Sequence, residues 1–118
     1  MLPAASTLTE PTIQIGASSL ASHMGAGASL ETDALRAVWL EGYEMIRAWC
    51  GDQGETVPGA ILNRAILEVA SELWARRSAP GGILAQYADL GAAPVRLARD
   101  PMLGARPLLA PYLKAGMA

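Results

Sequence analysis

Two amphipathic stretches joined by a short loop constrain most strongly what this chain can fold into. In residues 30–50 and again in residues 58–77, apolar side chains recur every three or four positions, which is the period of an α-helix. Because the loop between them, GDQGETVPG, is short, the two helices are expected to pack as antiparallel neighbours. The residues expected to form the helical core are Leu35, Trp39, Ile46, Trp49, Leu62, Ile66, Val69 and Leu73. The sequence therefore predicts an all-α fold, a small helical bundle built on two long antiparallel helices with extended N- and C-terminal arms.

The ends of the two predicted helices carry residues that favour helix initiation and termination. Ser29 suits an N-cap, Gly51 lies where a left-handed residue often ends a helix, and Pro58 suits a first helical turn. The stretch SAPGG at residues 78–82 ends the second helix. Gly42 lies on the apolar stripe of the first helix, and its missing side chain predicts a close helix crossing there.

The segments on either side of the helix pair have less regular patterns. In the stretch TIQIG, Ile13 and Ile15 alternate as they would on one side of a short extended segment. The Gly, Ala and Ser composition of residues 16–29 is typical of a flexible linker. The expected organisation is an extended N-terminal arm and linker over residues 1–29, a helical core domain over residues 30–94 and a C-terminal docking arm over residues 95–118.

The charge of the chain is small but unevenly distributed. The net charge is −2, yet residues 1–60 hold two basic and seven acidic side chains, whereas residues 61–118 hold seven basic and four acidic ones. So small a net charge does not by itself favour binding to nucleic acid or to a membrane surface. The longest apolar runs are far shorter than the roughly 20 residues that a spanning helix needs, and the N-terminus lacks a basic leader. We therefore expect a cytoplasmic product without a membrane span.

Residues typical of catalytic or metal sites are scarce. His23, the only histidine, lies in the predicted linker, which disfavours a metal site. Cys50, the only cysteine, lies on the apolar stripe with no histidine near it in sequence, so a buried structural thiol is favoured over a catalytic dyad. The stretch GAGASL lacks the third glycine and the preceding strand of a dinucleotide-binding loop. The sequence therefore predicts no enzymatic activity, no metal and no cofactor.

Four stretches of the sequence together resemble one known family. They are AWCG, VPGAI, LNRAILEVASELWARRSAPGG and VRLARDPMLGARPLLAPYL, and the similarity covers roughly residues 30–113. This layout is similar to that of the small head-tail connector (adaptor) proteins of long-tailed bacteriophages, which are helical subunits that form a ring beneath the portal. The most specific parts are ELWARRSAPGG and DPMLGARPLLAPYL. The resemblance implies a structural virion protein that is assembled in the bacterial cytoplasm and joins the DNA-filled capsid to the tail.

The same resemblance implies a set of partners. The chain would form a ring homo-oligomer, twelve-fold in the family, and would contact the phage portal protein and a tail-side connector or stopper protein. Non-specific contact with DNA in the lumen and no contact with a membrane are further expectations. A ring requires two complementary flanks on each subunit, and an acidic half that meets a basic half would supply them.

The irregular C-terminal arm is the candidate docking site for the portal. Its prolines keep an arm partly extended, and aromatic and arginine side chains often dominate interfaces. The candidate portal-docking residues are Arg99, Arg106, Leu108, Leu109 and Tyr112. One alternative is that residues 83–113 wrap around the chain's own two-helix core. Another is that the chain is a small helical regulatory or protein-interaction module, antitoxin-like and non-enzymatic.

Overall fold

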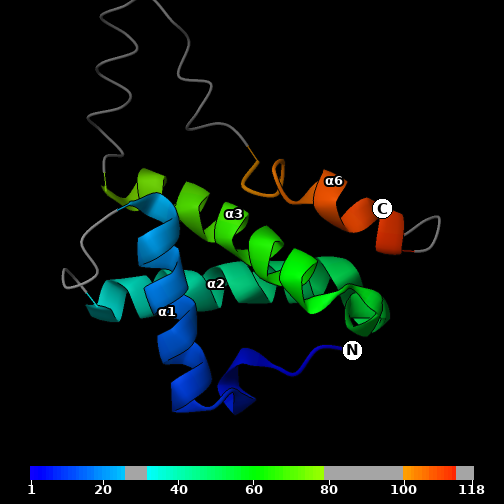
Figure 1. Ribbon diagram of the computed structural model, residues 1–118, viewed down its shortest axis with the longest axis horizontal. Helices are drawn as coiled ribbons and strands as arrows, with labels where there is room; N and C mark the ends of the chain where they lie inside the picture. The colour runs from blue at the N-terminus through cyan, green and yellow to red at the C-terminus, as the bar shows by residue number, and fades with distance from the viewer. Residues whose placement is uncertain (26–31, 79–99, 114–118) are drawn as a thin grey trace, which may run out of the picture.

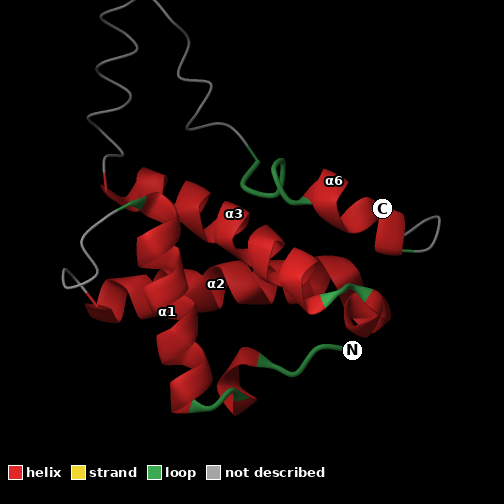
Figure 2. Ribbon diagram, in the orientation of Figure 1, coloured by secondary structure: helices red, strands yellow, loops and turns green. Residues whose placement is uncertain are grey.

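The computed structural model describes residues 1–25, 32–78 and 100–113 (Figure 1). Every regular element in these ranges is helical, which confirms the all-α fold, and Figure 2 shows no strand in them. The α-helices are α1 (Glu10–Met24), α2 (Thr32–Cys50), α3 (Gly59–Ser78) and α6 (Arg106–Leu109). Short 3-10 helices lie at Ala5–Thr7 (η1), Gly51–Thr56 (η2) and Ala110–Tyr112 (η3).

Helices α2 and α3 form the antiparallel pair that the sequence predicts. In Figure 1 the chain runs along α2, turns through η2 and returns along α3 in the opposite direction. The close crossing expected at Gly42 is confirmed, because a Cβ atom there would stand only 3.2 Å from the Cβ of Ala70. Of the predicted core, the buried residues are Leu35, Trp39, Ile46, Ile66 and Val69, while Trp49, Leu62 and Leu73 are partly buried at its margin.

Residues 10–24 of the predicted N-terminal arm and linker form a helix, so the extended interpretation of the TIQIG stretch is wrong. Helix α1 begins after Thr9, whose Oγ1 accepts a hydrogen bond from the Thr12 amide, and ends at Gly25 in the left-handed conformation. The helical period separates the two isoleucines that were expected on one side, since Ile13 is 7% exposed and Ile15 is 67% exposed. Alanine favours a helix, and the small residues of α1 let it pack closely on its neighbours.

The apolar face of α1 has the spacing of a helix that packs on a core. It consists of Ile13, Ala17, Leu20 and Ala21, all buried. In Figure 1, α1 crosses α2 and reaches α3. The core therefore involves three long helices, and the two-helix core of the sequence prediction is incomplete.

The first eight residues also pack on the helices, mainly through their backbone. Tyr43 donates its hydroxyl proton to the Pro3 carbonyl at 2.7 Å, and Arg47 Nε donates to the Leu2 carbonyl at 2.9 Å. The Ala5 amide donates to Glu44 Oε1 at 2.7 Å. The Leu2 side chain fills the space over a buried glycine of η2, where a Cβ atom would stand 2.5 Å from its Cγ. This N-terminal strap is fastened along the second half of α2.

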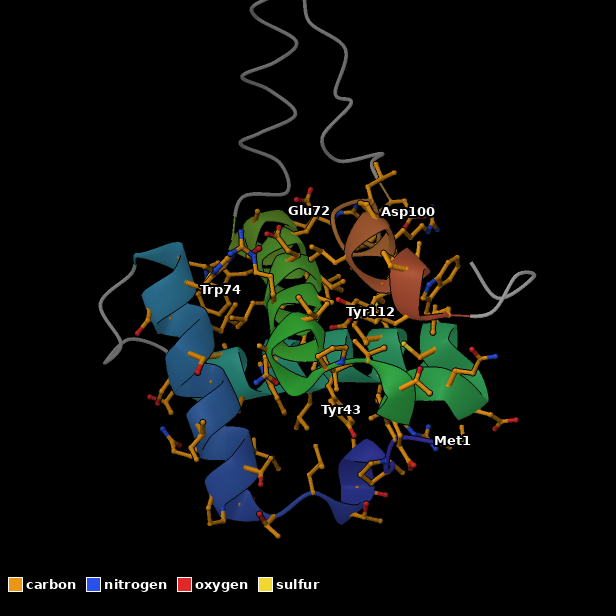
Figure 3. The ribbon with its side chains drawn as sticks, turned by 45° about the vertical axis from the view of Figure 1, so that its right-hand side comes forward. Met1, Tyr43, Glu72, Trp74, Asp100 and Tyr112 are labelled. Atoms are coloured by element: carbon orange, nitrogen blue, oxygen red, sulfur yellow. The ribbon has the colours of Figure 1, made fainter. Side chains whose placement is uncertain are left out.

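Residues 100–113, here called the C-terminal segment, pack on α3. In Figures 1 and 3 this segment lies on the side of α3 opposite to α1. Its buried side chains are Met102, Ala105, Leu109 and Leu113. The described part of the expected docking arm is therefore not an arm, because its apolar side chains complete the core of the same chain.

The helical state of α1 predicts opposite outcomes for two alanine substitutions on the same helix. Leu20 is fully buried, so Leu20→Ala should lower the free energy of unfolding by about 2–5 kcal/mol. Ile15→Ala removes an exposed side chain and should change it by less than about 0.5 kcal/mol. Urea unfolding of both variants measures the difference. Equal, small effects would show that α1 does not pack on the core.

Candidate functional site

His23 and Cys50, the most reactive types of side chain among the described residues, belong to no metal-binding cluster. No group of three or more His, Cys, Asp or Glu side chains that could hold a metal occurs in the part of the chain that the structure describes. Cys50 is fully buried at the end of α2, and burial raises the pKa of its thiol. The thiolate is the nucleophilic form of cysteine, and a raised pKa disfavours it. Cys50 is therefore suited to packing and not to nucleophilic attack. His23 is exposed near the end of α1.

The candidate portal-docking residues have different environments in the structure. Leu109 is fully buried in the chain's own core, so it is not available as an anchor, and Leu108 is partly buried. Tyr112 remains 37% exposed, while its carbonyl accepts a hydrogen bond from the Thr56 hydroxyl at 2.9 Å. Arg99 lies outside the described residues. Only part of the predicted docking set therefore faces solvent.

Arg106 fastens the C-terminal segment to α2. Its guanidinium group pairs with the Asp100 carboxylate, and its central carbon lies 4.9 Å from the centre of the Trp49 ring. Asp100 Oδ1 also accepts a hydrogen bond from the Met102 amide at 2.8 Å. That backbone hydrogen bond, together with the charge of Arg106, lowers the pKa of Asp100. Arg106 is thus engaged within the chain, and its role in docking stays a prediction.

The two most specific motifs of the sequence lie together in this region. The ELWARR stretch ends α3, and the DPMLGARPLLAPYL stretch forms the C-terminal segment that packs on it. Figure 3 shows Glu72 of the first motif near Asp100 of the second. The charge of Arg76, also on α3, contributes to the lowered pKa of Asp100. The two motifs therefore form one packed unit although 22 residues, 78–99, separate them.

The ion pairs that join two described residues each lie within one half of the sequence. Arg36 pairs with Glu10 across α1 and α2, and both residues belong to the acidic half. Arg64 pairs with Glu68 at 2.9 Å along α3, and both belong to the basic half. The Asp100–Arg106 pair also lies within the basic half. These pairs leave the net charge of each half unchanged, because each pair holds one acidic and one basic group of the same half.

A surface hollow that the sequence analysis does not predict lies between α1 and α3. Its deeper part has a volume of about 260 Å³, and it continues along α1 as a more open depression that shares three of its residues. We call the whole the α1 groove. The deeper part is lined by Thr12, Ile15, Gly16, Ser19, Trp39, Asn63 and Leu67. The open part adds Gln14, Ser18, Ser22 and His23.

The α1 groove combines an aromatic side chain with uncharged polar neighbours. Trp39 is 7% exposed, and its ring stacks on that of Tyr43 with centroids 5.6 Å apart. Among the described residues, no Asp, Glu, Lys or Arg lines the groove, and Arg36, which donates a hydrogen bond to Gln14 of the open part, is paired with Glu10. Such a surface suits an uncharged, partly apolar partner, because a buried charge would find no counter-charge there. The one sequence signal for this groove is a helical period through residues 10–24, which the extended interpretation overlooked.

No known protein family matches the sequence, and neither the curated proteins nor the solved structures give a significant match. No helix in the described residues is both long and apolar enough to cross a membrane.

The contact between Gly16 and Trp39 predicts a destabilising alanine substitution. A Cβ atom at Gly16 would stand 2.2 Å from Trp39 Cε2, so the indole must shift, which disturbs its stacking on Tyr43. Gly16→Ala should therefore lower the free energy of unfolding by about 1–3 kcal/mol, although alanine favours a helix. The matched control is Gly59→Ala, where no atom lies within 4 Å of the new Cβ. Thermal unfolding that is equal for both variants would contradict the close contact.

The lowered pKa of Asp100 predicts a pH-dependent stabilisation of the C-terminal segment. A carboxylate whose pKa falls below its ordinary value of 3.8 on folding stabilises the folded state above that value, and the stabilisation is lost as the pH falls through the lowered pKa. Asp100→Asn should therefore unfold at lower urea concentration than the wild type at pH 7, and the difference should shrink below pH 3.8 and vanish once the pH is below the lowered pKa of the folded state. A difference that persists unchanged in acid would assign the effect to side-chain shape and not to charge.

Proposed function

We propose that this chain is a non-enzymatic structural subunit of a bacteriophage head-tail connector. In this proposal the copies form a ring beneath the portal at the head-tail interface of the virion, twelve-fold as the resemblance implies. The ring contacts the portal protein on one side and a tail-side connector or stopper protein on the other. DNA passes through the lumen, where contact with it is non-specific.

The observation that carries the proposal is the packing of the two resembling motifs on each other. ELWARR on α3 and DPMLGARPLLAPYL in the C-terminal segment are the most specific parts of the resemblance, and they form one structural unit. Leu109 of the C-terminal segment is fully buried in the core, the Asp100–Arg106 pair lies within that segment, and the charge of Arg76 on α3 acts on Asp100. Motifs that pack in this way determine the shape of a subunit, as a structural protein requires.

Docking to the portal takes a different form in this proposal from the one that the sequence predicts. An extended arm over the described residues is excluded, since residues 100–113 complete the core. The surfaces left for partners are the exposed faces of the folded subunit, which include Tyr112 and the α1 groove. A folded surface loses less conformational entropy on binding than an arm that must first be ordered.

The experiment that tests the proposal is negative-stain microscopy of the purified protein, alone and mixed with portal rings from the phage that encodes it. We expect rings with a central channel, either free or stacked on the portal. An unrelated ring-forming protein in place of the portal serves as a control for non-specific adhesion. Chains that remain monomeric and do not bind the portal would contradict the proposal. Salt-sensitive binding to duplex DNA, or tight binding to one small protein, would instead favour a regulatory module.

A further inference from the structure

We propose that the α1 groove of one copy of this chain receives the exposed apolar side chains Leu103 and Tyr112 of the C-terminal segment of a second copy. The contact is head-to-tail, so it repeats from copy to copy. This inference rests on the proposed function, because it names the two surfaces through which neighbours in the ring would meet.

The first observation is where the exposed large apolar side chains lie. Among the described residues they are Met1, Ile15, Leu103 and Tyr112. Single exposed apolar residues are ordinary on a protein surface, so their location is what matters. Apart from Met1, they lie on two parts of the chain, helix α1 and the C-terminal segment. Ile15, 67% exposed, lines the α1 groove, and the other two lie on the C-terminal segment with exposures of 47% and 37%.

The second observation is that these two surfaces lie on either side of a single helix. Leu67 of α3 lines the α1 groove, while the next residue, Glu68, lies beside the C-terminal segment. A Cβ atom at Gly104 would stand 3.3 Å from Glu68 Oε2. Figures 1 and 3 show α1 and α6 on opposite sides of α3. Two different surfaces that face apart cannot pair about a two-fold axis, whereas a head-to-tail contact between them repeats and can close into a ring.

The third observation is that neither of the two surfaces carries an unpaired charged side chain among the described residues. In the part of the chain that the structure describes, no acidic, lysine or arginine side chain lines the groove, and the nearby Arg36 is paired with Glu10. The charged side chains within residues 100–113 are Asp100 and Arg106, which pair with each other. Contact between the two surfaces therefore buries no unpaired charge, which would be costly. A charged partner such as a nucleic acid would find no counter-charge in the groove, so the observations favour a second copy as the occupant.

The test uses two charge insertions and their mixture. Ile15→Lys places a charge in the groove and leaves the C-terminal segment intact, and Leu103→Lys does the reverse. Both positions are exposed in the monomer, so neither variant should lose helix content or thermal stability. The matched control is Ala37→Lys, which adds the same charge on the exposed face of α2, four residues from both Asp33 and Glu41. Sedimentation velocity measures self-association over a range of protein and salt concentrations.

The expected result has three parts. The wild type and Ala37→Lys should self-associate, and the association should persist at high salt because the contact is apolar. Each of the two surface variants alone should associate at least about tenfold more weakly, since the inserted charge must be desolvated. An equal mixture of Ile15→Lys and Leu103→Lys should form heterodimers that do not grow. In such a pair the one intact groove holds the one intact C-terminal segment, and the surfaces left over are both altered.

Several outcomes would overturn the inference. They are a wild type that stays monomeric at all concentrations, surface variants that associate like the wild type, and a mixture that forms no heterodimer. The proposed function is judged separately by portal-bound rings. If such rings form equally well from the wild type and from both variants, the contact inferred here is wrong and the connector function stands. If the wild type neither self-associates nor binds the portal, both fail.

Discussion

The fold depends on the burial of α3 from several directions at once. Fully buried residues such as Ala65 and Val69 lie on this helix together with partly buried ones such as Leu67 and Trp74, so its apolar surface is wider than one neighbour can cover. Helix α2 covers one part, α1 another and the C-terminal segment a third. A helix with apolar side chains on several faces is stable in water only when each face has a partner. This requirement explains why both ends of a short chain fold back on its centre.

The helix pair could be predicted from the sequence because its signals are local and strong. Three features within about 50 residues predict it: the apolar period indicates the helices, the glycine-containing loop indicates the turn between them, and Gly42 indicates the close crossing. Helix α1 was missed because its Gly, Ala and Ser composition is shared by linkers and by closely packed helices. The helical period of residues 10–24 favours the helix, but the packing partner of its small residues, Trp39, is remote in sequence and packs against Gly16.

The prediction that the C-terminal segment forms a docking arm is wrong for a related reason. Prolines and glycines show correctly that residues 100–113 form no long helix, but they do not determine where the segment packs. Its position follows from pairings such as Arg106 with Trp49 and Thr56 with Tyr112, which join residues more than 50 positions apart. The helical period of residues 10–24 is not enough to predict the α1 groove, because the groove exists only where α1, α2 and α3 meet. The candidate interaction surfaces are thus properties of tertiary packing and not of any motif.

The N-terminal strap has a consequence for how this protein can vary in sequence. Its hydrogen bonds with Tyr43, Glu44 and Arg47 all involve backbone atoms of residues 2–5. Backbone atoms are the same for almost every amino acid, so positions such as Pro3 and Ala4 can drift without losing these bonds. Substitutions should be destabilising instead at Tyr43, Glu44 and Arg47 of α2 and at Leu2, whose side chain packs over Gly54 and so sets the register of the strap. In relatives of this protein, we expect more sequence variation in the strap than at the α2 positions beneath it.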